Sequence, residues 1–180
     1  MTENKLPKPF NYAVFETLFG WVGVAGTEKG LIRIVLPEKT KKEAWQQLTN
    51  FFHTPVLLKE NTVCFSMLIE KIKKYFAGEY VSFVDEKICL ENYTSFQRGI
   101  LQKAREIPYA SVKTYKWLAE EANYPKAYRA AGGVMGKNPL PLIVPCHRVI
   151  GSGGRLVGFS ATGGLSLKQR MLELEGILVK

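Results

Sequence analysis

Residues 140–154, LPLIVPCHRVIGSGG, place a cysteine beside one of the chain's two histidines, behind an apolar run and two prolines. A thiol becomes a strong nucleophile as the thiolate, and a histidine, a positive charge or the start of a helical turn lowers its pKa. All three are close to Cys146: His147 is adjacent, Arg148 follows, and Pro145 is a common opening residue of a helical turn. The segment therefore predicts nucleophilic chemistry at Cys146.

A third residue can complete this pair. Adjacent side chains seldom face each other, so we expect a water to bridge Cys146 and His147 rather than a direct hydrogen bond. Glu175 precedes Gly176 at the end of the final predicted helix, where a carboxylate meets the negative end of the helix dipole. A residue placed against this local preference can mark a function. Here the carboxylate would orient and stabilise the imidazole, which completes a relay of Cys146, water, His147 and Glu175. An inert buried cysteine beside a surface histidine would otherwise explain the pair.

The helix that would carry Glu175 spans residues 165–176 and has apolar residues at core spacing. Ser166 and Gln169 stand in the register of a capping box at its start. The side chains expected to face the core are Leu167, Met171, Leu174 and Leu178.

Two short helices with a tight break precede the cysteine. Thr114 can cap residues 115–122, and Pro125 suits the first position of residues 125–138, which gives a helix-turn-helix outline. Arg129 stands among small residues on the second helix, as if another molecule must approach the backbone there. The small residues are Ala127, Ala130, Ala131, Gly132 and Gly133. Packing in a core explains these small residues equally well, but it does not explain Arg129.

A longer helix before this pair is capped by Thr94 and closed by Pro108. One face of it carries Phe96, Ile100, Ala104 and Ile107.

The first ninety residues are predicted to be mixed α and β. Glycine-punctuated runs of β-branched and aromatic residues indicate an antiparallel meander over residues 12–17, 20–27 and 31–37. Apolar periodicity predicts helices over residues 41–52 and 65–76, the second ending before Gly78. Residues 80–90 should be extended, and His53, which stands alone, is interpreted as structural.

Together these elements predict an α+β protein of two domains. Residues 1–90 form a scaffold with a small antiparallel sheet, and residues 91–180 form a mostly helical domain with the helix-turn-helix and Cys146.

Charge is unevenly placed along the chain. The net charge is +9, made of +2 from residues 1–90 (12 Lys and Arg against 10 Asp and Glu) and +7 from residues 91–180 (13 against 6). A basic half favours a polyanionic partner, nucleic acid before a membrane surface, because neutralised phosphates release counterions. A solvated basic surface explains the charge alone equally well.

The cysteines and the N-terminus point to an ordinary cytoplasmic protein. Cys64, Cys89 and Cys146 are odd in number and lack a CxxC pair, so we expect free thiols, no disulfide framework and no metal site. No signal peptide begins the sequence, and no segment reaches the ~18 apolar residues of a membrane span.

The sequence around Cys146 resembles that of the O6-alkylguanine-DNA alkyltransferases, also called methylated-DNA:protein-cysteine methyltransferases. PCHRVIGSGG is similar to the family's active-site signature. Further matches are TYKWLAEEA, PKAYRAAGGVMGKNPLPLIVPCHRV and GGLSLKQRMLELEG, with looser ones in the first half. The resemblance implies a ribonuclease-H-like scaffold for residues 1–90. It also implies repair by direct reversal: Cys146 takes the alkyl group from O6-alkylguanine, or O4-alkylthymine, once and irreversibly, with no cofactor.

The resemblance also implies residue roles. Asn138 would hold the turn that presents Cys146, whose thiolate His147 and Glu175 activate. Tyr115 would press a phosphate so that the guanine swings out, and Arg129 would fill the vacancy in the duplex. The second helix would lie in the minor groove of double-stranded DNA, bound by a monomer. The DNA-binding set is completed by Lys126, Ala127, Ala130, Gly132 and Arg148.

The guanine pocket follows from the same resemblance, with the carbonyls of Cys146 and Val149 reading the guanine amino group. Its lining would be Met135, Pro141, Val149, Phe159 and Ser160. The loop GFSATGGL departs from the family pattern, because it has Phe159 in place of a tyrosine and contains additional residues. The departure removes a hydroxyl and leaves the preference for particular alkyl groups open.

Two other functions fit parts of the sequence. A Cys-His hydrolase would need a histidine from elsewhere, and His53 is the one available; such an enzyme would turn over repeatedly. A non-enzymatic alkyltransferase-like protein would share the groove-binding helix and the arginine, but it would lack the acceptor cysteine.

Overall fold

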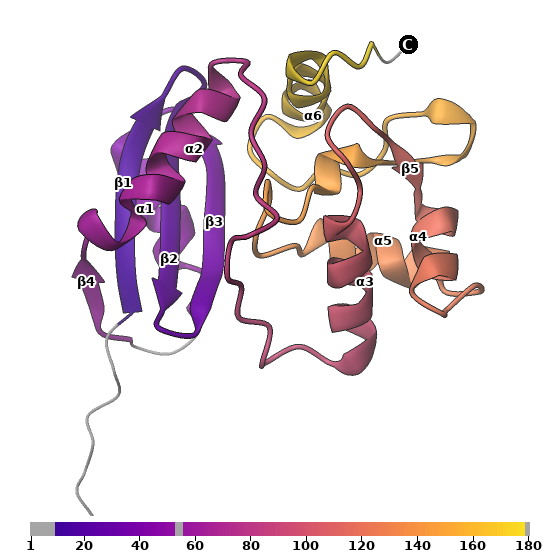
Figure 1. The fold of residues 1–180 in the computed structure, drawn as a ribbon, viewed down its shortest axis with the longest axis horizontal. Helices are drawn as coiled ribbons and strands as arrows, with labels where there is room; N and C mark the ends of the chain where they lie inside the picture. The colour runs from indigo at the N-terminus through magenta and orange to yellow at the C-terminus, as the bar shows by residue number, and fades with distance from the viewer. Residues whose placement is uncertain (1–9, 53–55, 179–180) are drawn as a thin grey trace, which may run out of the picture.

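The computed structural model describes residues 10–52 and 56–178, so His53 lies outside the described residues. Figure 1 shows two adjoining parts, one built around a sheet and one mostly helical. The first part consists of β1 (Phe10–Thr17), β2 (Gly20–Thr27), β3 (Gly30–Glu38), α1 (Lys41–Thr49), β4 (Leu58–Glu60), a 3-10 turn (Val63–Phe65) and α2 (Ser66–Phe76). The second consists of α3 (Ser95–Arg105), β5 (Lys113–Thr114), α4 (Tyr115–Glu121), α5 (Tyr128–Gly136), a 3-10 turn (Cys146–Arg148), β6 (Val149–Ile150), a second 3-10 turn (Ser152–Gly154) and α6 (Gly164–Leu174).

The sheet has the order β3-β2-β1-β4. The first three strands form the antiparallel meander that the sequence predicts. β4 was not expected: it pairs in parallel with β1, Phe10 opposite Leu58, and its three residues are too few to show an alternating pattern. The expected extended segment 80–90 is not a strand, since one isolated bridge, Leu31 with Ile88, is all the pairing it makes.

Alternating side chains of the sheet pack on two different helices, because successive residues of a strand point to opposite faces. Val14 packs with α1, through Ala44 and Leu48. Ala13 and Phe15 point to the other face and pack with α2. The core on the α2 face continues into the second part, where it includes α3 to α6. One continuous core therefore joins the two parts and holds α2 beside α6.

Local signals place several helix ends correctly, although α1 ends at Thr49 rather than at residue 52. Thr94 and Gln97 form a capping box at the start of α3, and the Thr114 hydroxyl accepts from the Trp117 N–H at the start of α4. α2 ends at Phe76, with Ala77 as its C-cap, and Gly78 follows with φ of 85°. These ends confirm the sequence-based prediction, because a cap or a left-handed glycine acts within one turn of the chain.

Two helix starts were predicted wrongly. α5 begins at Tyr128, not at Pro125, because the chain makes a further turn in which the Ala127 N–H donates to the Tyr124 carbonyl at 2.8 Å. α6 is preceded by Gly163 with φ of 93° and no side-chain cap, so Ser166 lies inside the helix.

The capping box expected at the start of α6 is therefore absent, and Gln169 donates to Glu173 instead. The far end of this segment also differs from the expectation. α6 ends at Leu174, and Leu178 lies beyond Gly176 with 88% of its surface exposed, so it is not a core residue. Leu167 and Met171 are buried as expected.

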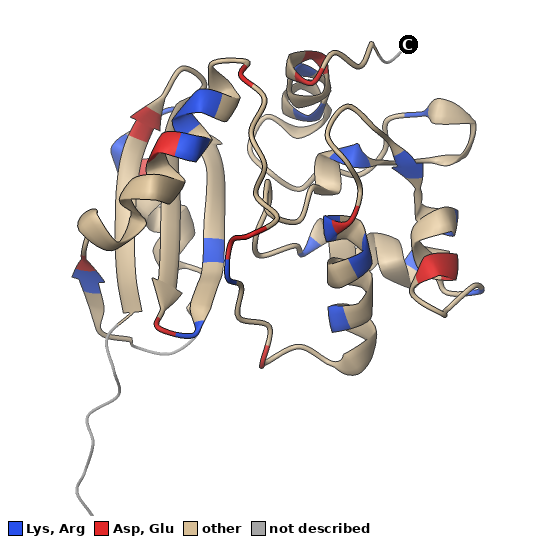
Figure 2. Cartoon of the chain, in the orientation of Figure 1, with Lys and Arg blue, Asp and Glu red and all other residues tan. Residues whose placement is uncertain are grey.

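Basic residues lie on both parts (Figure 2), with α3 and β5 among the elements that carry them. Within the described ranges, no helix has the length and apolar character needed to cross a bilayer.

Candidate active site

Cys146 opens a 3-10 turn directly after the loop that follows α5. Asn138 holds this loop from inside: its amide nitrogen donates to the Val144 carbonyl at 2.7 Å, and its amide oxygen accepts from the Leu140 N–H at 3.0 Å. The loop also contains Leu142 in the left-handed region, with φ of 75°. A buried leucine adopts this conformation at a cost, so the surrounding contacts fix the backbone that presents Cys146.

The surroundings of Cys146 act on its acidity in opposite directions. Burial raises the pKa of the thiol, while the Asn138 amide, the positive charge of Lys168 and neighbouring backbone N–H groups lower it. Lys168 is itself fully buried, and its ammonium donates to the Val149 carbonyl at 2.6 Å and the Val157 carbonyl at 3.0 Å. Burial lowers the pKa of this lysine to about 8, and the nearby Cys146 opposes that shift.

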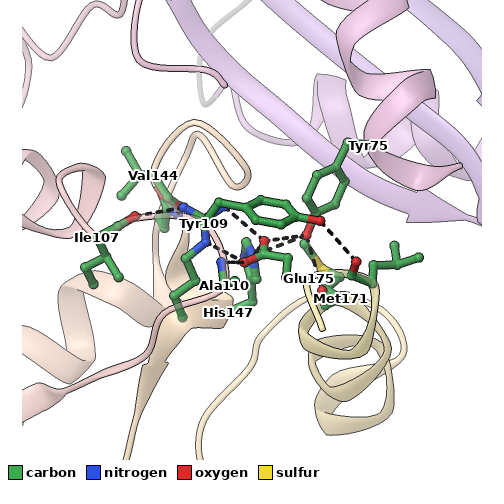
Figure 3. Close-up of polar contacts among 11 residues, drawn as sticks. Tyr75, Ile107, Tyr109, Ala110, Val144, His147, Met171 and Glu175 are labelled. Atoms are coloured by element: carbon green, nitrogen blue, oxygen red, sulfur yellow. Dashed lines mark hydrogen bonds and ion pairs between the residues drawn. The ribbon is translucent and has the colours of Figure 1, made fainter. Parts of the chain in front are cut away.

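His147 and Glu175 form the buried pair that the sequence suggested (Figure 3). His147 Nε2 lies 2.7 Å from Glu175 Oε1, and neither side chain has exposed surface. Because the carboxylate accepts, Nε2 carries the hydrogen, and Nδ1 is left as the basic nitrogen. Nδ1 is buried and has no hydrogen-bond partner among the described residues. Burial lowers the pKa of His147, and Glu175 opposes this, so the imidazole is neutral at rest.

Glu175 accepts from several groups besides His147. Arg148 donates through Nε to Oε2 at 2.9 Å and through Nη2 to Oε1 at 3.0 Å, and the Ala110 N–H donates to Oε2 at 3.2 Å. The Tyr75 hydroxyl donates to Oε1 at 3.0 Å. Burial by itself would raise the pKa of Glu175, but the hydrogen bonds from His147 and Arg148 and the positive charge of Arg148 outweigh it and hold that pKa at about 2.

Arg148 corrects one expectation. The sequence placed it among the DNA-binding residues, but its guanidinium is buried and its Nη1 donates to the Ile107 carbonyl at 2.8 Å. With its donors turned to Glu175 and Ile107, it supports the carboxylate rather than a DNA-facing surface. The motif gave no sign of this, because Ile107 and Glu175 are remote from Arg148 in the sequence.

A cavity of about 480 Å³ has Cys146 in its wall. Four of the five residues expected to line a guanine pocket also line this cavity: Met135, Pro141, Phe159 and Ser160. Val149 does not: it is fully buried, and its carbonyl, which was expected to read the base, already accepts from Lys168.

The loop before α6 is held against this cavity from both parts of the fold. Ser160 donates to the Gly136 carbonyl at 2.6 Å, and Thr162 donates to Glu38 of β3 at 2.6 Å. The cavity is therefore walled by both parts, since β3 contributes Val35 and Glu38.

The exposed side of α5 carries the predicted arginine and small residues. Arg129 and Ala130 are exposed, and a Cβ placed on Gly133 would meet nothing within 4 Å. Packing in a core therefore does not account for the glycine at 133. A Cβ on Gly132 would lie 3.8 Å from the ring of Tyr115. Lys126 and Ala127 precede the helix, in the turn from α4.

Tyr115 lies where α4 begins, between α5 and the loop that closes the cavity. Its hydroxyl would lie 3.6 Å from a Cβ on Gly158, and burial, followed by the effect of Cys146, raises the pKa of Tyr115 to about 12. Tyr115 packs against the same core cluster that contains Cys146, although 31 positions separate them in the sequence.

Sequence reasoning missed two residues of the site. Lys168 is one position from a predicted core residue on an amphipathic helix, where a lysine is normally exposed. Tyr75 belongs to a half in which we expected no site residue. It lies within the helix predicted over residues 65–76, but the polar partner of its hydroxyl lies 100 positions away, at Glu175.

Replacing Lys168 with methionine should slow the reaction of Cys146 with iodoacetamide about tenfold, because the charge that opposes burial of the thiolate is lost. The rate is measured by peptide mapping over time. Lys137→Met, which removes an exposed lysine from the cavity lining, is the control. Equal rates for Lys168→Met and the unmodified chain would show that the ammonium does not act on the thiol.

The same lysine affects stability. Its pKa falls from 10.5 to about 8 on folding, so the folded chain binds fewer protons than the unfolded chain between these values. Its contribution to the free energy of unfolding therefore rises as the pH increases from about 8 to 10.5. Lys168→Met should lack this rise in urea unfolding experiments, whereas Lys137→Met should keep it.

Comparison with known proteins agrees with this fold and site. Residues 10–89 match the family model described as "6-O-methylguanine DNA methyltransferase, ribonuclease-like domain", and residues 95–177 match its "DNA binding domain". The site thus defines a known class of protein: a DNA-binding methyltransferase with a cysteine beside a buried imidazole and carboxylate, on a fold that contains a helix-turn-helix. The chain belongs to the 6-O-methylguanine DNA methyltransferase family.

Individual relatives cover nearly the whole chain. A methylated-DNA-protein-cysteine methyltransferase of Methanosarcina acetivorans is 38% identical over 165 residues, which are 92% of this chain and 97% of the relative. The protein of the same name from Mycolicibacterium paratuberculosis is 34% identical, over 91% of each chain. The crystal structure of Mycobacterium tuberculosis OGT in complex with DNA superposes with a TM-score of 0.74 at 32% identity, covering 92% of each chain.

Proposed function

We propose that this protein repairs DNA by direct reversal, transferring the alkyl group of O6-alkylguanine in duplex DNA to Cys146 in a single turnover. The observation that carries the proposal is the site itself: Cys146 lies in the wall of a cavity, next to a buried His147–Glu175 pair whose Nδ1 is free to accept a proton. The relatives named as methylated-DNA-protein-cysteine methyltransferases support the same activity. O4-alkylthymine is a further candidate substrate.

The thiolate forms during the reaction rather than at rest. Burial raises the pKa of Cys146 and lowers that of His147, so both groups are neutral before substrate binds. A water between Sγ and Nδ1 would carry the thiol proton to the imidazole, and Glu175 would stabilise the imidazolium. The nearby Lys168 ammonium and the backbone N–H groups at the turn stabilise the thiolate.

The transfer itself is one displacement. The sulfur attacks the alkyl carbon, a carbon–sulfur bond forms and the bond from carbon to O6 breaks. The electron pair of that bond stays with the base, which becomes guanine on taking up one proton. The thioether has no hydrolysable bond, so each molecule reacts once.

The alkylated base must leave the duplex to reach the cavity. The cavity volume of about 480 Å³ is within the range of small-molecule pockets. Unstacking a base from the duplex costs roughly a few kcal/mol, and contacts between the flipped base and the cavity would offset this cost. The exposed α5 face would approach the minor groove, with Arg129 entering the stack and Tyr115 against a phosphate. Lys126, Ala127, Ala130 and Gly132 complete this surface.

The organisation of the chain is proposed on the same basis. Residues 1–90 are the ribonuclease-H-like scaffold and residues 91–180 the alkyl-transfer domain. The protein would act as a cytoplasmic monomer.

The test is intact-mass measurement and peptide mapping after incubation with a duplex containing O6-methylguanine. One methyl group should appear, on the Cys146 peptide, and product should stop accumulating at one equivalent. Continued turnover would favour a hydrolase. Binding without methylation would favour an alkyltransferase-like protein, and methylation of Cys64 or Cys89 would reject the assignment of Cys146.

Replacing Glu175 with glutamine should slow methylation of Cys146 at neutral pH by about tenfold or more, because the neutral amide no longer stabilises the imidazolium. It should also lower stability by about 3 kcal/mol, since the buried Arg148 guanidinium loses its counterion. The rate is therefore measured well below the melting temperature of the variant.

Glu173→Gln, an exposed position near the end of the same helix, is the matched control and should react normally. A normal rate for folded Glu175→Gln would contradict the relay.

A further inference from the structure

One side chain of the buried network around Glu175 comes from the first part of the fold. Tyr75 lies on α2 and is 1% exposed. Its hydroxyl oxygen is 3.0 Å from Glu175 Oε1, 3.2 Å from His147 Nε2 and 3.5 Å from the Met171 carbonyl oxygen. Figure 3 shows the tyrosine reaching the carboxylate from the side opposite Ile107.

The direction of these hydrogen bonds follows from counting hydrogens. A tyrosine hydroxyl has one hydrogen, and the carbonyl of Met171 and the ionised Glu175 can only accept. His147 Nε2 gives its hydrogen to Oε1 at the shorter distance of 2.7 Å. The Tyr75 hydrogen therefore goes to Oε1, the nearer and charged acceptor. Burial, followed by the charge of Glu175, raises the pKa of Tyr75 well above 10, so it remains a donor throughout the neutral pH range.

Glu175 Oε1 thus accepts from three groups at once: His147, Tyr75 and Arg148. Each hydrogen bond to a carboxylate stabilises its charged form, so an oxygen with three donors attracts the proton of any one of them less strongly than an oxygen with a single donor. The tyrosine therefore has two effects on the imidazole: it fixes the position of the oxygen that orients the ring, and it weakens the attraction of that oxygen for the ring's proton.

We propose that Tyr75 is a positioning residue of the alkyl-transfer relay, holding Glu175 Oε1 against His147 and taking up part of its charge. This inference rests on the proposed function and extends it, because the first part of the fold then contributes to the chemistry as well as to the core. Tyr75 touches no substrate and acts through Glu175. The titratable and charged groups that face the network are Cys146, Arg148, Lys168 and Tyr109.

Tyr75→Phe keeps the ring and removes the hydroxyl, so it tests this role directly. With one donor fewer, Oε1 should hold the imidazolium more strongly, and the pKa of His147 should rise by about half a unit or more. The acid limb of the methylation rate against pH should move up by the same amount. Glu175→Gln should move it in the opposite direction, so the two variants are distinguished by sign.

Tyr109→Phe is the matched control, since its hydroxyl donates to the Leu174 carbonyl at 3.1 Å and not to Glu175. It should leave the acid limb unchanged. Thermal melting of both variants checks that each is folded, and a purely structural tyrosine would change the melting temperature without moving the pH profile.

An NMR titration of the His147 ring in Tyr75→Phe gives a second readout that needs no alkyl transfer. The chain has two histidines, so His53→Gln identifies the His147 resonance. An upward shift of the His147 pKa supports the proposal, whereas an unchanged or lowered pKa overturns it. Failure of the unmodified chain to methylate would reject the proposed function, while the NMR titration would still decide the role of Tyr75.

Discussion

Cys146→Ser is expected to abolish alkyl transfer while leaving the affinity for alkylated duplex DNA largely intact. The serine hydroxyl does not form an oxyanion near neutral pH, so a loss of roughly four orders of magnitude or more in rate is expected. Binding should persist, because the proposed DNA contacts lie on the exposed α5 face and in the basic second half, whereas the thiol of Cys146 is buried.

The measurement has two arms. Methylation of the protein is followed by intact mass under single-turnover conditions, and affinity is measured by titrating a labelled duplex with and without O6-methylguanine. Cys64→Ser is the matched control, because this thiol is exposed and is not among the residues that line the cavity. A serine variant that still consumed the lesion stoichiometrically would remove Cys146 from the mechanism.

Arg129→Ala should reduce transfer from duplex DNA about a hundredfold or more and leave the reaction with free O6-benzylguanine nearly unchanged. Arg129 is exposed on a helix face lined by small residues, so it is the long side chain placed to fill the space of an extruded base. The free base has no stack to leave and needs no such support.

Lys126→Ala separates this role from charge neutralisation. Lys126 is exposed in the turn before α5, and its loss should weaken binding to all duplexes alike and lower the salt slope by about one. If Arg129→Ala behaved in the same way, it too would be a phosphate contact. Equal losses with the duplex and with free O6-benzylguanine would instead indicate a distorted cavity.

The family resemblance and the local sequence patterns predicted much of the fold and of the candidate site. The adjacent Cys146 and His147, with Glu175 at a helix end, predicted a relay that the fold brings together as a buried His–Glu contact. Thr94 and Thr114 located two helix starts, because a capping side chain acts on backbone N–H groups only two or three residues away. The three-stranded meander followed from glycine punctuation and alternating apolar residues.

Tertiary structure decided where the long polar side chains lie. Arginine and lysine side chains are normally exposed, so the sequence offered no reason to expect Arg148 and Lys168 in the core. Each is buried because a partner distant in the sequence accepts its hydrogen bonds: Glu175 for the arginine and Val149 for the lysine. The Tyr75 hydroxyl likewise finds Glu175 only because one core joins α2 to α6.

Sequence alone therefore determined features that depend on neighbours along the chain: the caps of α3 and α4, the strand alternation and the reactive pair. It did not determine the partners of Tyr75, Arg148 and Lys168. Periodicity shows which face of an element turns inward, but a buried polar group is stable only beside a matching donor or acceptor, and that match exists only once distant elements have packed together.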